Sequence, residues 1–360
     1  MARAIFLSFR VLGWLLLAMV TLEICGRTED TVRYGAPFWG NYDNESLYTY
    51  DSQGKHGRPN ASYLKWKLNE AGYRGPALRS GTYRIACIGS SETFGLYESP
   101  ENEWPRQLER ELNHQAGQNI FEVVNTAYLG MALSTSLRRL DPMMQLLRPR
   151  LVLIYPSYAT YISPAYAEAP PGVIPPPRPV QSRLMSRIKE LLKNSLPEGL
   201  QDKVREFQVR RESRRLHVMD RLPDASVEQF ANDLDAMVRK IRAQGAEVVL
   251  ITHANRFGNS VQPHERWLLT AWRKFYPELR EDGFLDMERR MSDVVRQTGV
   301  RDSVVVIDAA SHLQPGPKNF AEFVHFTDDG AHAMASLVAH GLQPIVSGQV
   351  TIVPVAAAAN

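Results

Sequence analysis

The stretch Arg84-Ile85-Ala86-Cys87-Ile88-Gly89-Ser90-Ser91-Glu92-Thr93-Phe94-Gly95 decides the fold that we expect. Residues 85–88 form a short apolar run bounded by turn residues, which is typical of a strand buried on both faces. Gly89 and the two serines end the strand, and an amphipathic helix is predicted to begin near Glu101. A hydroxyl in this position lies at the carboxyl edge of a parallel sheet, where open α/β sheets bind ligands. The plainer interpretation is that these serines form only a turn.

Four further apolar runs follow, and helical patterns separate them. The predicted strands are 121–124, 151–155, 247–252 and 303–308, and the predicted helices are 101–118, 135–147, 227–244, 285–298 and 330–340. Strands that alternate with helices predict a parallel, doubly wound sheet. Because crossovers between parallel strands are right-handed, we expect an α/β fold: a three-layer α/β/α sandwich with a parallel, flavodoxin-like sheet of five strands.

Length and composition limit the classes of function. The chain has 360 residues, enough for one large α/β domain with insertions. Its net charge is only +3, and the basic residues are interleaved with acidic ones, so no nucleic acid partner is expected. The two cysteines, Cys25 and Cys87, provide neither a disulfide framework nor a metal motif. No cluster of His, Asp or Glu has metal-ligand spacing, so we expect no metal and no cofactor.

An apolar segment at the N-terminus predicts contact with a membrane. Residues 11–22 are almost entirely apolar but shorter than the ~20 residues of a full span, unless the span begins at Ile5 and Arg10 snorkels to the interface. No small-x-small cleavage site precedes Cys25, which favours an uncleaved anchor over a cleaved signal. We expect residues 1–26 to be a membrane anchor or signal segment. The body would then be extracytoplasmic: periplasmic in a Gram-negative cell, or secreted if the segment is cleaved.

The other boundaries follow from changes in composition. Residues 27–80, rich in Tyr, Asn, Gly and Asp, are expected to be an N-terminal extension, and residues 346–360 a C-terminal tail. Between them we place one domain, 81–345, with an insertion at 160–225 that is first proline-rich and then basic. The plainer interpretation of this insertion is a solvated helical excursion. The alternatives are a lid, a membrane-surface contact or a site for an acidic polymer.

Polar residues follow the predicted strands at one edge of the sheet. A serine hydroxyl such as that of Ser91 is a poor nucleophile unless a base takes its proton. His325 is the candidate base, and Glu322, three residues earlier, is the candidate to orient it. The backbone N–H groups of Ser91 and Gly130 are candidate donors to an oxyanion. His253 ends an apolar strand, and we predict a structural or substrate-contacting role for it.

At these residues the chain resembles the SGNH or GDSL-type serine hydrolases. Three blocks carry the resemblance, in the family's order: Gly89-Ser90-Ser91-Glu92-Thr93-Phe94-Gly95, Asn125-Thr126-Ala127-Tyr128-Leu129-Gly130, and Glu322-Phe323-Val324-His325-Phe326-Thr327-Asp328-Asp329-Gly330. The resemblance extends over about residues 69–342. It implies an α/β/α hydrolase fold with Ser91 as nucleophile, His325 as base and Glu322 as acid, and with Gly130 as a donor to the oxyanion.

Three positions depart from the family pattern. Ser90 stands where the first block usually has Asp, and Glu322 stands where the last block usually has Asp. After the third strand the family normally supplies a side-chain amide, but this chain has Tyr155-Pro156-Ser157-Tyr158. Ser157 or Tyr158 would then have to complete the oxyanion hole.

The leading hypothesis is a membrane-tethered serine esterase or acylhydrolase that removes acyl groups, acetyl among them, from an extracytoplasmic polysaccharide or envelope glycan. Its partners would be an acylated carbohydrate or another ester, and the membrane. Candidate substrate-binding residues are Tyr158, His253 and Asn255, and Asn255 is also a stand-in for the missing amide. Two alternatives remain open: an O-acyltransferase that uses the same three residues, and a non-catalytic polysaccharide-assembly protein of the same fold.

Overall fold

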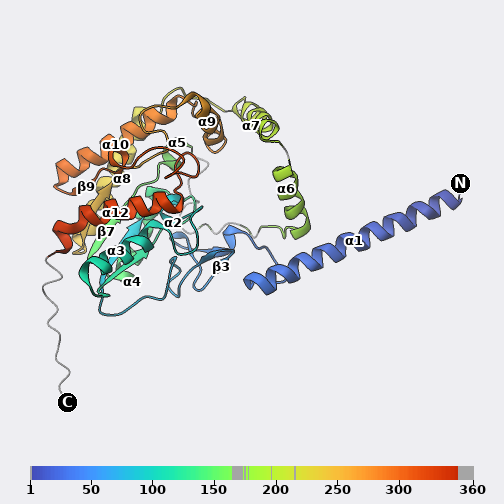
Figure 1. Cartoon of the computed structure of the whole chain (residues 1–360), viewed down its shortest axis with the longest axis horizontal. Helices are drawn as coiled ribbons and strands as arrows, with labels where there is room; N and C mark the ends of the chain where they lie inside the picture. The colour runs from blue at the N-terminus through green and yellow to red at the C-terminus, as the bar shows by residue number, and fades with distance from the viewer. Residues whose placement is uncertain are drawn as a thin grey trace, which may run out of the picture.

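The computed structural model describes residues 2–163, 173, 176, 178–195, 197–214 and 216–347. One long helix, α1 (Ala2–Tyr34), projects from a rounded body that contains the sheet and its covering helices (Figure 1). Most of the proline-rich stretch and all of the tail beyond residue 347 lie outside the described residues.

Five parallel strands form the central sheet and confirm the predicted fold class. They are β5 (Tyr83–Ile88), β6 (Phe121–Asn125), β7 (Leu151–Ile154), β8 (Glu247–Ile251) and β9 (Val305–Ile307), in the order β6-β5-β7-β8-β9. The order reverses at β5, because β6 pairs on one side of it and β7 on the other. A reversal of this kind opens a crevice at the carboxyl ends of the strands, directly after residue 88.

Helices cover both faces of the sheet. α3 (Trp104–Ala116) and α12 (Asp328–Val346) pack on one face; α4 (Leu133–Leu147), α8 (Asp224–Ala243) and α10 (Gly283–Asp302) pack on the other. Alternate residues of β5 serve the two layers: Ile85 and Cys87 face α3 and α12, whereas Ala86 and Ile88 face the opposite layer. Burial on both faces explains why the strand reads as a continuous apolar run.

The N-terminal extension forms two small hairpins that the sequence pattern did not predict. β1 (Tyr48–Asp51) pairs with β2 (Gly54–Gly57), and β3 (Ser62–Tyr63) pairs with β4 (Trp66–Lys67). Arg74 fastens the extension to the body: its buried guanidinium lies 3.0 Å from the Glu103 carboxylate and donates to the carbonyl of Gly95 at 2.7 Å. The extension therefore packs against the segment that follows Ser91.

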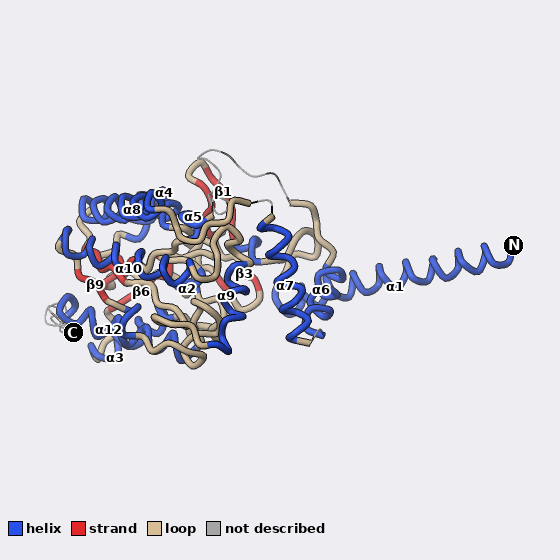
Figure 2. Tube along the Cα trace, turned by 90° about the horizontal axis from the view of Figure 1, so that it is seen from above, coloured by secondary structure: helices blue, strands red, loops and turns tan. Residues whose placement is uncertain are grey.

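The insertion is largely helical. It contains α5 (Ala159–Ile162), α6 (Arg183–Ser195) and α7 (Glu198–Ser213). Figure 1 shows α6 running transverse to α1, and Figure 2 shows α7 running transverse to it. α7 contacts α9 (Arg266–Arg273) of the body. The remaining short helices are α2 (Ser91–Phe94), α11 (Ala309–His312), η1 (Asn44–Leu47) and η3 (Pro263–Glu265).

α1 continues beyond the predicted anchor. The sequence predicts an anchor or signal segment over residues 1–26, but the helix runs on to Tyr34. By length and composition, the part from Arg10 to Tyr34 is long and apolar enough to cross a membrane. A signal sequence near an N-terminus has the same properties, so the helix is compatible with either an anchor or a signal.

Candidate active site

Ser91 is the first residue of α2, at the carboxyl end of β5. The turn before it requires glycine at position 89, because a Cβ there would lie 2.1 Å from Oγ1 of Thr93. The N–H groups of Thr93 and Phe94 donate to the carbonyl of Ser90 at 3.1 and 2.7 Å and close the turn. The Ser91 hydroxyl is thus held at the crevice in the sheet, where it donates to Oε2 of Glu92 at 3.4 Å.

His325 and Glu322 form a hydrogen-bonded pair in the loop before α12. Nδ1 of His325 is bonded to Oε1 of Glu322, which also accepts the backbone N–H of His325 at 3.3 Å. Because the carboxylate accepts the proton of Nδ1, Nε2 is left as the basic nitrogen of the ring. Nε2 is buried and has no hydrogen-bond partner among the described residues.

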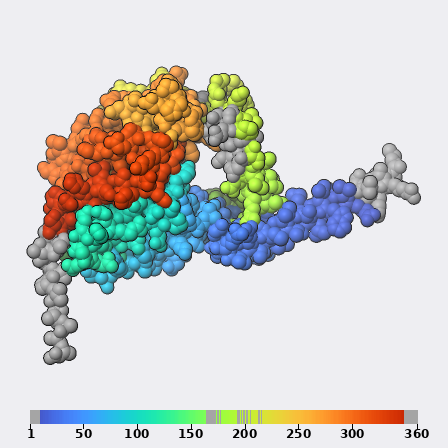
Figure 3. Space-filling model, viewed as in Figure 1, coloured from blue at the N-terminus to red at the C-terminus, as the bar shows by residue number. Residues whose placement is uncertain are grey.

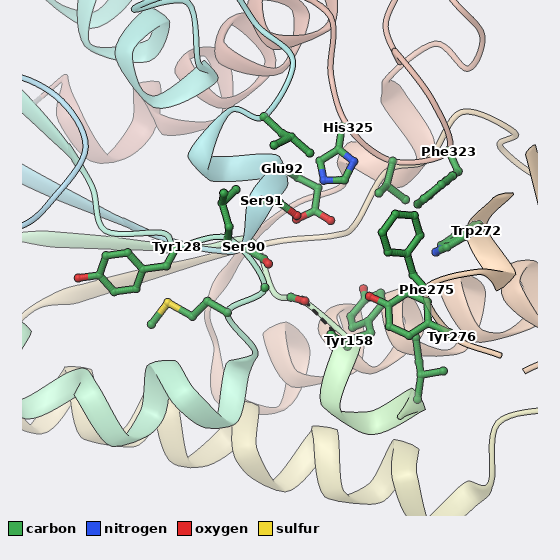
Figure 4. A pocket seen from close by; sticks show the side chains of 18 of the residues that line it. Ser90, Ser91, Glu92, Tyr128, Tyr158, Trp272, Phe275, Tyr276, Phe323 and His325 are labelled. Atoms are coloured by element: carbon green, nitrogen blue, oxygen red, sulfur yellow. Dashed lines mark hydrogen bonds between the residues drawn. The ribbon is translucent and has the colours of Figure 1, made fainter. Parts of the chain in front are cut away.

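A pocket of about 660 Å³ joins these groups. The predicted site residues on its wall are Ser91, Gly130, Ser157, Tyr158, His253, Glu322 and His325. Figure 4 shows Ser91, Glu92 and His325 side by side on one wall. The structure does not bring Asn255 into the pocket: its Oδ1 accepts the N–H of Phe257 at 3.0 Å in a local turn.

Two backbone N–H groups at the pocket are available to an oxyanion. That of Ser91 begins α2, and that of Gly130 belongs to a residue with φ +73°, which glycine adopts without strain. In the described part of the chain, neither group donates to another backbone or side-chain atom. Ser157 lines the same pocket, and its Oγ accepts only a long contact of 3.5 Å from the N–H of Ala159.

Behind Ser91 lies a buried row of charged groups that the sequence pattern did not connect. Nδ1 of His253 pairs with Oε2 of Glu288 at 2.9 Å, and Nε2 lies 3.8 Å from Oε1 of Glu92. Burial lowers the pKa of His253, but the two flanking carboxylates outweigh burial and raise it. Burial raises the pKa of Glu92, but His253 and the charge of His325 outweigh that effect and lower it. His253 is therefore an imidazolium and Glu92 a carboxylate at neutral pH.

The sequence carried a signal for one of these acids. α10 buries Phe284, Met287, Met291 and Val295 at helical spacing, and Glu288 falls on the same stripe. An acid on a buried stripe needs a partner, because an unpaired buried charge is costly. Glu92 gave no such signal, since an acidic residue in the first turn of a helix is common at exposed sites too.

The pKa of His325 depends on groups from several segments. Burial lowers it, but the hydrogen bond with Glu322 and the charges of Glu92 and Glu98 outweigh burial and raise it. Burial in turn raises the pKa of Glu98 to about 7. The ring of Tyr97 packs edge-on against His325 with centroids 5.6 Å apart. His325 is therefore more basic than an ordinary histidine and keeps its proton to a higher pH.

The pocket wall combines aromatic and polar residues. One end is aromatic and is lined by Trp272, Phe275, Tyr276 and Phe323 (Figure 4). Trp272 is fixed there by stacking on Phe323, with ring centroids 5.0 Å apart. The polar part of the lining comes from the N-terminal extension and consists of Asn44, Glu45, Tyr50 and Lys55. A ligand that fills the pocket would meet both apolar rings and polar groups.

Fold and site together define an α/β/α protein with a serine, a histidine and an acid at the carboxyl edge of its sheet. No family model and no curated protein matches the sequence. The solved structures to which this chain is similar include a putative lipolytic protein of the G-D-S-L family from Desulfitobacterium hafniense, with 15% identity, coverage of 72% of this chain and 100% of that one, and a TM-score of 0.42.

Two other similar structures are described as enzymes. The lipase/acylhydrolase from Enterococcus faecalis is 15% identical, with coverage of 73% of this chain and 97% of that one and a TM-score of 0.43. A catalytic mutant of Axe2, an acetylxylan esterase from Geobacillus stearothermophilus, is 11% identical, with coverage of 74% and 95% and a TM-score of 0.41.

Proposed function

We propose that this protein is a serine ester hydrolase in which Ser91 is the nucleophile, His325 the base and Glu322 the residue that orients the base. One observation carries the proposal: Nε2 of His325 is buried and finds no hydrogen-bond partner within the described part of the chain, on the pocket wall that also holds the Ser91 hydroxyl. A buried nitrogen left unpaired costs free energy, and active sites retain such groups for a substrate or an intermediate.

In the first half-reaction, Oγ of Ser91 attacks the ester carbonyl while Nε2 of His325 takes the hydroxyl proton. The carbonyl oxygen becomes an oxyanion and accepts hydrogen bonds from the N–H groups of Ser91 and Gly130. The C–O bond to the alcohol then breaks, and His325 returns the proton to the departing oxygen. The products of this half are the free alcohol and an acyl ester on Ser91.

In the second half-reaction, water replaces the alcohol. His325 accepts a proton from the water, whose oxygen attacks the acyl carbonyl at the same oxyanion site. Collapse of the intermediate releases the acid and returns the proton to Oγ of Ser91. Glu322 stays ionised throughout and stabilises the imidazolium that forms twice in the cycle.

We propose further that the substrate is an acyl ester of a hydroxyl-rich alcohol, such as a polysaccharide or envelope glycan reached from a membrane-tethered position. The polar part of the pocket lining, with Glu45 and Lys55, supports this, because it offers hydrogen-bond partners to hydroxyl groups. The aromatic end would hold the acyl group. Tyr158 and His253 lie deeper in the wall, buried, and reach substrate less than their neighbours do.

The experiment is ester hydrolysis by the full chain in detergent, with 4-nitrophenyl esters of graded acyl length and with an O-acetylated polysaccharide. Labelling by a fluorophosphonate probe is measured in parallel. We expect labelling at Ser91, and loss of both labelling and hydrolysis in Ser91→Ala. Hydrolysis that survives in Ser91→Ala would overturn the proposal. Acylated sugar in place of free acid would assign the site to acyl transfer instead.

A further inference from the structure

α1 has an apolar, exposed N-terminal part and a charged C-terminal part that joins the body. Leu15 and Leu22 expose 57% and 55% of their surfaces, and only 11% of the apolar window within the candidate span from Arg10 to Tyr34 is buried. Beyond Glu23 the same helix carries charged residues and joins the body. A bilayer entered by α1 would therefore surround its N-terminal part and end near Glu23.

α6 begins where this apolar stretch ends. Oε2 of Glu23 accepts the N–H of Leu184 and the hydroxyl of Ser182, both at 2.8 Å, and so caps the start of α6. α6 runs transverse to α1 in Figure 1, and α7 runs transverse to it in the perpendicular view of Figure 2. If α1 enters a bilayer along its normal, the two helices lie parallel to the membrane surface at the level of Glu23.

Ion pairs fix which face of α6 points toward the body. Arg183 lies 2.8 Å from Asp30, and Arg187 lies 2.6 Å from Glu29; both acids are in the C-terminal part of α1. The arginines, four residues apart, share one face of α6. That face points to the body end of α1, away from its apolar stretch.

The opposite face of α6 is apolar and exposed. At 100° per residue, Met185, Ile188 and Leu192 lie across the helix from the arginines, with 45%, 36% and 62% of their surfaces exposed. This face therefore points toward the apolar, N-terminal part of α1. A face of this kind is costly in water but suited to the boundary between headgroups and acyl chains.

α7 continues the same surface. Leu200, Val204 and Phe207 recur at four- and three-residue spacing and are exposed by 46%, 42% and 66%. Val209, by contrast, is buried. Exposed basic residues border the apolar positions of both helices, among them Lys189, Lys203 and Arg211. Figure 3 shows the two helices standing at the edge of the body above α1.

We propose that α6 and α7 form an interfacial arm that lies on the membrane entered by α1, with its apolar face at the headgroup level. The occupant of this face is a phospholipid bilayer. Three observations support a bilayer as the occupant: the arm starts at the end of the apolar stretch, it runs transverse to α1, and its apolar face turns toward that stretch. The basic border would add attraction to anionic headgroups.

The test places an environment-sensitive nitrobenzoxadiazole label on introduced cysteines of the full chain in a Cys25→Ser background, in which the remaining native cysteine, Cys87, is buried. The protein is reconstituted in vesicles of phosphatidylcholine and phosphatidylglycerol. Labels at Ile188→Cys and Phe207→Cys report the apolar face, and Glu190→Cys, an exposed acid about 200° around α6 from Ile188, is the matched control. Leu15→Cys reports whether α1 has entered the bilayer.

We expect labels at 188 and 207 to be quenched by lipid-borne nitroxides near the headgroups, and several-fold less by aqueous iodide than the label at 190. Two outcomes would overturn the proposal: labels at 188 and 207 that iodide reaches as readily as the label at 190, or a Leu15 label that no lipid nitroxide quenches. A response at 188 and 207 to an acidic polysaccharide, but not to vesicles, would also reject the bilayer. None of these readouts depends on esterase activity.

Discussion

The carboxylate of Glu92, the residue directly after Ser91, lies 3.8 Å from Nε2 of His253. Glu288 supports His253 from the other side, so the row carries one cation between two carboxyl groups. The charge of Glu92 also acts on His325, on the same wall of the pocket. A fixed negative charge near the base favours its protonated form, and this has a direct consequence for the pH dependence of the rate.

Glu92→Gln should move the acidic limb of the kcat/KM profile to lower pH. His325 accepts a proton only in its neutral form, and the charge of Glu92 raises its pKa. Removing that charge lowers the pKa, so activity persists further into acid. Glu322, Glu98 and Tyr97 also face His325 and stay unchanged in this variant. Glu228→Gln, an exposed acid on α8 that does not line the pocket, is the control and should leave the limb in place; an unmoved limb in Glu92→Gln would contradict the assignment.

Glu322→Gln should lower kcat/KM by roughly 10²- to 10⁴-fold, because the amide no longer holds the ring in the tautomer that leaves Nε2 basic. Glu322→Asp keeps the charge on a shorter arm and should retain more activity. Asp329→Asn alters an exposed acid nearby and serves as the control. Steady-state hydrolysis of a 4-nitrophenyl ester measures all three. Equal rates for Glu322→Gln and Asp329→Asn would show that Glu322 does not contribute to catalysis.

Arg74→Met should reduce the free energy of unfolding by about 3–5 kcal/mol, because it leaves the Glu103 carboxylate buried without its partner. The two side chains are only 4% and 3% exposed. Replacing both residues, as in Arg74→Met/Glu103→Leu, should reduce the free energy of unfolding by less than the sum of the two single changes. Arg289→Ala, which breaks an exposed pair with Asp286, should cost at most about 1 kcal/mol. Guanidinium unfolding in detergent checks the series, and additive losses at positions 74 and 103 would argue against the pair.

Gly89→Ala should reduce fluorophosphonate labelling of Ser91 by on the order of 10²-fold, since a displaced nucleophile loses its alignment. The added Cβ would lie 2.1 Å from Oγ1 and 2.6 Å from Cβ of Thr93, so the turn must shift. Gly117→Ala is the control: Gly117, unlike Gly89, has a positive φ, but nothing lies within 4 Å of its added Cβ. Labelling of Gly89→Ala at the rate of Gly117→Ala would show that the turn tolerates a side chain.

The sheet was predictable because its strands are buried on both faces. Leu151–Ile154 and Glu247–Ile251 read as apolar runs with clear ends, and the alternation of strands with helices then fixes the architecture. The hairpins of the extension were not predictable, because strands as short as Ser62–Tyr63 show no period.

The candidate site was predictable only where residues follow strands or form a local spacing. Ser91 and the Glu322–His325 pair belong to this kind, and the structure brings them to one pocket. The pairing of His253 with Glu92 and Glu288 joins three segments, and no local pattern encodes it. The position of Asn255 likewise depends on the course of the loop after β8, which its sequence does not specify.

Because α1 is one unbroken helix, it fixes the distance between its apolar stretch and the body. Ion pairs with Arg183 and Arg187 stabilise its C-terminal part, so the helix is a rigid spacer between its apolar stretch and the body. At 1.5 Å per residue, the part from Glu23 to Tyr34 holds the body about 17 Å beyond the end of the apolar stretch. If α1 enters a membrane and Ser91 is the nucleophile, as proposed, the pocket stays at a fixed height above the bilayer and reaches only esters displayed at that height.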